Sequence, residues 1–164
     1  MNLLQDGTWS DVTFVVKGEA IKAHSLVLFA RCEVFEKHLN SGMRESLSKE
    51  VEIDDCEPQT FKAFLHFLYT DDFHPLERIL KPEPSEGCAS AGVAEVSILQ
   101  ELLSVSHKYQ VTRLRLWCEQ QLCRRVSSSE VLSVLCQAHL CEAKVLERNC
   151  LKRIKENMEK LAST

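Results

Sequence analysis

A short strand pair that leads directly into an apolar helix constrains the fold of this chain more than any other feature. Residues 11–17 alternate between apolar and polar side chains, which predicts a half-buried strand. Lys17-Gly18 predicts a turn, and residues 19–23 predict a second strand that returns beside the first. Residues 23–31 then predict a helix that is apolar on nearly all sides, so we expect it to be buried.

The rest of the chain predicts one further strand and then almost continuous helices. Residues 34–39 favour a short helix, and residues 49–53 alternate like a third strand. Apolar residues at helical spacing predict later helices that begin near residues 58, 94, 114, 131 and 142. This order indicates an α+β fold with a small sheet near the front of the chain.

Two of these segments carry more detailed expectations. Residues 71–92 hold three of the four prolines, which predicts a long surface loop with one short apolar turn at residues 76–80. Along the last two helices we expect an apolar stripe that faces inward. Its members are Val131, Leu132, Leu135 and Ala138 in the first helix, and Leu146, Cys150, Ile154, Met158 and Leu161 in the second.

Composition excludes several classes of partner. The 164 residues suffice for one ample core, or for a domain with an appendage. A net charge of −4 argues against the basic face of a nucleic-acid binder. Apolar runs stay well short of the roughly 20 residues of a membrane span, and the first residues do not resemble a signal peptide. We therefore expect a protein of the cytoplasm or nucleus that binds neither nucleic acid nor membrane.

Residues with reactive or metal-binding side chains do not form a recognisable site in the sequence. The eight cysteines include no Cys-x-x-Cys pair, and the nearest cluster, Cys136, His139 and Cys141, has no second ligand pair of the kind zinc needs. No phosphate-binding glycine loop and no nucleophile motif are present, and His24 is interpreted as a structural residue that opens a helix. We expect no metal, no cofactor and no catalytic residue. A cysteine-based enzyme or redox sensor is the remaining alternative, and it would require a thiol of unusually low pKa.

Three segments together resemble the BTB (POZ) family, over residues from about 3 to 125. Ser10-Asp11-Val12-Thr13-Phe14 is similar to the family's first core strand, and residues 23–35 are similar to its Ala-His-Lys-x-x-Leu-x-x-x-Ser-x-x-Phe signature. Residues 51–70 resemble its third strand and the helix that ends in Tyr-Thr. The resemblance implies a BTB/POZ fold, in which a small three-stranded sheet is capped by a helical cluster and followed by extra C-terminal helices.

The resemblance also implies how the chain divides. Residues 1–126 would be the BTB domain, with the loop at 71–92 longer than in most members, and residues 127–164 would be a helix pair like the BACK or three-box extension of ubiquitin-ligase adaptors. Residues 114–119 resemble the Leu-Lys/Arg-x-x-Cys-Glu helix of the MATH–BTB (speckle-type) adaptors. Two positions depart from the usual signature, because Ser25 stands where lysine is common and Cys32 where serine is common. Ser25 weakens the case for the charged pocket that transcriptional repressors of the family use.

A first candidate site follows from the resemblance to cullin-3-binding members of the family. Met43-Arg44-Glu45 fits the hydrophobic-x-Glu motif that these members place before the third strand, and Tyr109 matches a family tyrosine at the border of the same surface. An exposed methionine adapts its shape to a partner's groove, and a glutamate steers the approach of a charged partner. Without the resemblance, Met43 packed on its own core, a solvated Glu45 and a packing role for Tyr109 are the simpler interpretations.

A second candidate site is a homodimer interface. Leu3, Leu4 and Trp9 are large apolar residues in a polar leading segment, and Val27 matches a family position against which that segment packs across a two-fold axis. Packing of the segment on its own subunit is the alternative. Many members exchange a further strand upstream, and we expect no such exchange here because the chain begins too late.

The sequence therefore predicts a non-enzymatic, dimeric BTB adaptor that binds cullin-3 and recruits substrates for ubiquitination. The substrate reader would lie elsewhere in a longer protein or in a bound partner. The alternative is a self-association module for scaffold or transcriptional assembly that does not bind a cullin.

Overall fold

The computed structural model describes residues 7–40, 48–80 and 91–162, and the chain divides into two compact units. The first unit consists of residues 1–82 and 108–111, and the second consists of residues 83–107 and 112–164. The predicted domain boundary at 126/127 falls inside the second unit, and the assignment of residues 127–164 to a separate extension stays a prediction.

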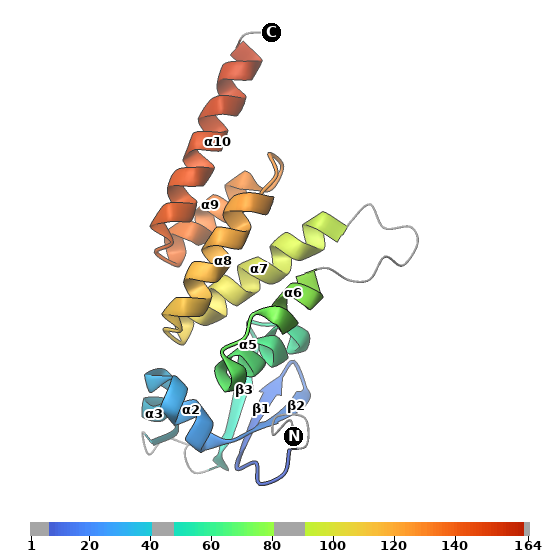
Figure 1. Cartoon of the computed structure of the whole chain (residues 1–164), viewed down its shortest axis with the longest axis vertical. Helices are drawn as coiled ribbons and strands as arrows, with labels where there is room; N and C mark the ends of the chain where they lie inside the picture. Colours follow the sequence, from blue (N-terminus) through green and yellow to red (C-terminus); the bar gives the residue numbers. More distant parts are fainter. Residues whose placement is uncertain (1–6, 41–47, 81–90, 163–164) are drawn as a thin grey trace. The chain divides into compact units, whose positions relative to one another are not determined.

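A three-stranded sheet forms the base of the first unit (Figure 1). Its strands are β1 (Val12–Val16), β2 (Glu19–Ala23) and β3 (Glu50–Ile53), in the order β2-β1-β3. β2 is antiparallel to β1, and β3 is parallel to it. The three predicted strands are therefore confirmed.

The β1–β2 hairpin is tight because its two turn residues accept positive φ. Lys17 has φ 48° and Gly18 has φ 86°, the combination of a type I′ turn whose twist matches that of the flanking strands. The register places Phe14 opposite Ile21 on one side and Val51 on the other, so three apolar side chains lie on the same face of the sheet.

The described helices of the first unit are α2 (Ser25–Arg31), α3 (Glu33–Asn40), α5 (Pro58–Thr70) and α6 (His74–Leu80). The apolar face of the sheet packs against two of them, α3 and α5. The ring of Phe14 lies 5.4 Å from the ring of Phe35 in α3 and 5.0 Å from the ring of Phe61 in α5, centroid to centroid. All three rings are fully buried, so this aromatic cluster is the centre of the core.

α6 occupies a segment for which the sequence predicted only a short turn. The carboxylate of Asp72 accepts the backbone N–H of His74 at 3.0 Å, and Pro75 follows in the first helical turn, where proline is tolerated. Leu76 and Leu80 lie one turn apart and are both buried. The start signal was present in the sequence, but the surrounding prolines favoured a loop.

The second unit is entirely helical within its described residues. Its helices are α7 (Ala91–Lys108), α8 (Thr112–Arg125), α9 (Val131–Leu140) and α10 (Lys144–Ala162), and α10 packs on α8 and α9. Across the part of the chain that the structure describes, no helix is both long and apolar enough to cross a membrane.

The predicted inner stripe of the last two helices is wrong at two of its described positions, and the side chain of Leu161 lies outside the described part of the chain. Leu132 is 64% exposed, because the buried side of α9 runs through Val131, Val134 and Ala138. Met158 is 65% exposed, because the side chains of α10 are fully covered only as far as Cys150. Apolar periodicity locates a buried stripe only to within about one position, which explains the error at Leu132. It also does not show where the covering helices end, which explains the error at Met158.

Two charged residues of α8 hold the turn between α9 and α10. The guanidinium of Arg115 donates to the backbone carbonyls of Cys141 (3.5 Å) and Glu142 (3.3 Å), and it lies 3.5 Å from the carboxylate of Glu119. Glu119, only 4% exposed, accepts the backbone N–H of Leu146 at the start of α10. Burial raises the pKa of Glu119 above its ordinary value, although the Arg115 guanidinium and the Leu146 N–H each act to lower that pKa. The Leu-Arg-x-x-Cys-Glu pattern thus has a structural role.

Candidate interaction surface

α2 is largely uncovered in the first unit, which contradicts the expectation of a buried helix. Only Leu28 is buried in α2, whereas Leu26 is 81% exposed and Val27 is half-buried. The prediction was wrong because an apolar helix shows that cover is required and does not show that the same chain supplies it.

A carboxylate from the neighbouring strand caps the start of α2. Asp11, immediately before β1, accepts the backbone N–H of Ser25 at 2.7 Å and its hydroxyl at 2.5 Å. Burial alone would raise the pKa of Asp11, but these hydrogen bonds and the Lys49 ammonium at 3.3 Å leave it below its ordinary value. Ser25 thus donates two hydrogen bonds to Asp11, and Lys49 supplies the neighbouring positive charge.

His24 connects the leading segment to α5 through three hydrogen bonds. Its backbone N–H donates to the Tyr69 hydroxyl at 2.8 Å, its Nδ1 lies 2.8 Å from the same oxygen, and its Nε2 lies 2.8 Å from the carbonyl oxygen of Thr8. A carbonyl only accepts, so Nε2 carries the proton; in the neutral ring Nδ1 then accepts from the Tyr69 hydroxyl. The structural role predicted for His24 agrees with this geometry.

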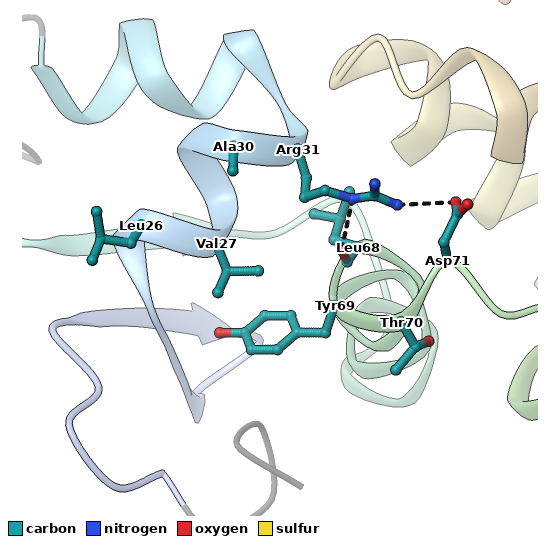
Figure 2. Close-up of a pocket in the computed structure, with 8 residues that line it drawn as sticks. All are labelled: Leu26, Val27, Ala30, Arg31, Leu68, Tyr69, Thr70 and Asp71. Atoms are coloured by element: carbon teal, nitrogen blue, oxygen red, sulfur yellow. Dashed lines mark hydrogen bonds and ion pairs between the residues drawn. The ribbon is translucent and has the colours of Figure 1, made fainter.

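A pocket of about 350 Å³ opens between α2 and the end of α5 (Figure 2). Its apolar lining comes from both helices and consists of Leu26, Val27, Ala30, Leu68 and Tyr69. Polar groups of Arg31, Thr70 and Asp71 complete the lining. The volume lies near the lower limit of the roughly 300–1,000 Å³ of pockets that take organic ligands.

One arginine ties the two walls of this pocket together. Arg31, the last residue of α2, donates to the carbonyl of Leu68 at 3.1 Å and pairs with the carboxylate of Asp71 at 3.0 Å, as Figure 2 shows. Asp71 ends α5 in the left-handed conformation, with φ 58°. Charge-assisted hydrogen bonds of Arg31 therefore link the two helices that bound the pocket.

Trp9 is the most exposed large apolar side chain that the structure describes, at 88%. It precedes β1 and follows Thr8, whose carbonyl faces His24. Together with Leu26 it leaves a large area of apolar surface in contact with water on the first unit. Exposed apolar side chains such as these become candidate binding groups where they gather into a patch.

The other predicted interface residues divide between described and undescribed segments. Val27 lines the pocket, and its role at a dimer interface stays a prediction. Leu3, Leu4, Met43 and Glu45 lie outside the described residues, so their predicted roles stay predictions.

Tyr109 has a packing position. Its ring is only 3% exposed, stacks on Phe35 at 4.3 Å, and lies 5.5 Å from the ring of Phe64. Its backbone carbonyl accepts the thiol of Cys32 at 3.1 Å, and burial raises the pKa of its phenol far above the ordinary value. Any part it plays in binding a partner is therefore indirect, through support of α3.

The thiols do not show the environment of a nucleophile. Among the cysteines that the structure describes, burial raises the pKa of Cys32, Cys118, Cys123, Cys141 and Cys150. A raised pKa lowers the thiolate fraction and therefore the reactivity. Within the described ranges no group of three potential metal ligands comes together, and His139 instead lies 3.3 Å from Glu147.

Comparison with known proteins places these observations in a family. A profile of the BTB/POZ domain matches residues 1–82. The chain is 36% identical to BTB/POZ and MATH domain-containing protein 4 of Arabidopsis thaliana over 156 residues, which are 95% of this chain and 33% of that protein. It is 35% identical to protein 6 of the same series and plant over 163 residues, which are 94% of this chain and 37% of that protein. The chain thus spans about a third of the length of these relatives.

A solved structure shows the same fold. The BTB domain of zebrafish PATZ1 superposes with a TM-score of 0.53 at 22% identity, over 74% of this chain and 83% of that one. At this identity the likeness concerns the fold alone, and it confirms the predicted α+β BTB architecture.

Proposed function

The chain belongs to the BTB/POZ family of protein-interaction modules, and we propose that it is a dimeric adaptor that binds cullin-3 and brings substrate proteins to a ubiquitin ligase. The observation that carries this proposal is the match to the BTB/POZ domain together with relatives that combine BTB/POZ and MATH domains. The substrate-binding part lies in a longer form of the protein or in a partner, and the complex works in the cytoplasm or nucleus.

The dimer is supported by the uncovered apolar surface of the first unit. Trp9 and Leu26 are largely exposed, and Val27 is half-buried at the wall of the pocket. A two-fold interface uses the same patch on both copies, so one patch of this kind suffices for a closed dimer. Burial of these side chains would supply the hydrophobic free energy that the single copy leaves unused.

Cullin-3 docks on the segment between α3 and β3. Met43 provides an adaptable apolar anchor, and Glu45 provides a charge that orients the partner. Tyr109 acts as a positioning residue, because its stack on Phe35 holds α3, whose last residue, Asn40, leads into this segment.

We propose no catalytic step. The described thiols with a resolved shift all have raised pKa values, which disfavours the alternative of a cysteine nucleophile or redox sensor. His24, which contacts the hydroxyl of the pocket residue Tyr69, has both ring nitrogens engaged by Tyr69 and Thr8.

The test is calorimetric titration of the purified chain with the N-terminal domain of cullin-3. Met43→Asp and Glu45→Lys should each weaken binding at least about tenfold, because one removes the anchor and the other reverses the steering charge. Glu19→Lys is the matched charge-reversal control, since Glu19 lies on β2 and pairs with Lys62 outside the proposed docking segment.

Two results would contradict the proposal in different ways. If the native chain does not bind the cullin domain but still forms dimers, the chain is the self-association module that the sequence left as an alternative. If the native chain binds and both variants bind equally well, a cullin adaptor remains but Met43 and Glu45 are not its docking site.

A further inference from the structure

We propose that Ser128 is a phosphorylation site whose phosphate group is received by a basic pocket on α10. This inference concerns the second unit and does not depend on the adaptor function proposed above. It depends on three features: an accessible hydroxyl, a pocket around it with an excess of positive charge, and hydrogen bonds that hold the hydroxyl against the pocket.

The Ser128 hydroxyl lies where a protein kinase can reach it. Ser128 is exposed and belongs to residues 126–130, which connect α8 to α9 without regular structure. In the transfer, Ser128 Oγ attacks the γ-phosphorus of ATP, and the bond from that phosphorus to the bridging oxygen breaks. ADP leaves, and the hydroxyl proton passes to the catalytic base of the kinase.

The pocket beside this hydroxyl carries three cations and one carboxylate. Its volume is about 390 Å³, many times the roughly 30 Å³ of one water molecule, so a phosphate group fits within it. A phosphoserine carries a charge of about −1.5 to −2 at pH 7, which balances the excess of positive charge. Besides Ser128, the lining comes from one face of α10 and consists of Asn149, Lys152, Arg153, Glu156, Asn157 and Lys160.

The one carboxylate of the pocket is only weakly engaged by a pocket lysine. The Lys152 ammonium lies 3.9 Å from the carboxylate of Glu156, and the two side chains are exposed. Exposed ion pairs of this length contribute little, because water screens them. A phosphate dianion offers Lys152 more charge and shorter charge-assisted hydrogen bonds, so it is the stronger partner.

Hydrogen bonds from α10 hold the connection that carries Ser128. The guanidinium of Arg153 donates to the backbone carbonyls of Val126 (2.6 Å) and Cys123 (3.0 Å). Asn157 Nδ2 donates to Ser128 Oγ at 3.1 Å, so the oxygen that would carry the phosphate already faces the pocket. Arg153 thus positions the connection, whereas the ammonium groups of Lys152 and Lys160 are the groups that would bind the phosphate.

The neighbouring serines do not offer the same environment. Among the three serines of the connection, Ser128 lines the pocket. The hydroxyls of Ser127 and Ser129 lie together, 2.9 Å apart, and Ser127 Oγ donates to the carboxylate of Glu130. A phosphate on Ser127 would therefore be repelled by an adjacent carboxylate.

A phosphate on Ser128 would fasten the second half of α10. The side chains of this helix are fully covered only as far as Cys150, whereas Lys152 and Lys160 lie beyond that point. Charge-assisted hydrogen bonds from these two lysines to the phosphate would join residues 152–160 to the connection between α8 and α9. The modification would thus order a helix end that the unmodified chain leaves largely uncovered.

The whole chain with phosphoserine installed at position 128 during synthesis tests the pocket. Phosphorus NMR should show that the second pKa of this phosphate, ordinarily about 6, is lower by about 0.5 or more than in a chain with phosphoserine at position 129. Salt at 1 M should remove the difference by screening. Hydrogen exchange of the backbone amides of residues 152–160 should slow about fivefold in the first chain alone.

Two lysine variants of the phosphoserine-128 chain identify the receptor. Lys152→Gln combined with Lys160→Gln should restore the ordinary pKa and the faster exchange. Lys155→Gln is the control, because Lys155 lies on the same helix but pairs with Glu159 at 4.0 Å, away from the pocket lining. The substituted side chains are exposed, and circular dichroism checks that each chain keeps its helices.

Mass spectrometry of the protein purified from its own cells, with and without phosphatase treatment, tests whether the modification occurs. A phosphatase-sensitive phosphate on Ser128 supports the proposal, and its absence overturns the modification. Equal pKa values in the two phosphoserine chains, or a lowered pKa that the double lysine variant leaves unchanged, overturns the pocket as the receptor of the phosphate.

Discussion

Asp11 is expected to stabilise the first unit by capping α2, and its replacement by alanine tests that role. Asp11→Ala removes the acceptor of the Ser25 backbone N–H and hydroxyl, at 2.7 and 2.5 Å, and the partner of Lys49 at 3.3 Å. Loss of a helix cap costs about 1 kcal/mol, and the exposed ion pair adds at most about 1 kcal/mol. We therefore expect the free energy of unfolding at neutral pH to fall by about 1–2 kcal/mol.

Urea denaturation followed by circular dichroism measures this difference, and its pH dependence provides a second test. Because the pKa of Asp11 is lowered in the folded chain, its contribution is complete above the ordinary carboxyl pKa of about 3.9 and is lost as pH falls through the lower folded value. The stability gap between native and Asp11→Ala chains should therefore narrow below about pH 4. Asp54→Ala, at an exposed position, serves as the control. Equal stabilities at neutral pH, or a gap that does not narrow in acid, would refute the capping argument.

Three further perturbations test the network around the pocket, the clamp on the second unit and the thiols. Tyr69→Phe should lower the free energy of unfolding by about 1–2 kcal/mol in thermal or urea melts, because the N–H of His24 loses its acceptor in a partly buried place; an unchanged melt would contradict the network. Glu119→Ala should cost about 2–4 kcal/mol by the same measurement, because Arg115 and the N–H of Leu146 lose a buried partner; a loss below 0.5 kcal/mol, on the order of a surface substitution, would show that the clamp is unimportant. In timed alkylation with mass spectrometry, exposed Cys136 should react before the buried cysteines, and a buried cysteine that reacts first would revive the redox alternative.

Local patterns in the sequence were sufficient to predict the sheet and most helices. Alternation over residues 11–17 and the Lys17-Gly18 pair encode the hairpin within a few residues, so no distant part of the chain needed to be known. Pro58 and the helical spacing after it likewise marked α5.

Features that depend on contacts between distant residues could not be predicted in the same way. Asp11 lies 14 residues before the helix start that it caps, and nothing in its immediate neighbours indicates that role. The Arg31–Asp71 pair, which joins the two walls of the pocket, spans 40 positions, and Tyr69 was noted only as part of a family motif. Each of these depends on how α2 and α5 pack.

Burial was the least predictable property of the candidate site. The same apolar residues that predicted a buried α2 leave Leu26 exposed, and Tyr109, predicted at the border of a binding surface, is buried. Periodicity reports which side chains avoid water and does not report which chain covers them. The exposed side chains are therefore more informative about partners than about the core.

Sedimentation equilibrium of the native chain is the most direct test of the central claim that the apolar surface around Trp9 and α2 is covered by a second copy. The account predicts a concentration-dependent species with twice the chain mass of 18.7 kDa. A single species of 18.7 kDa at every concentration examined would contradict it.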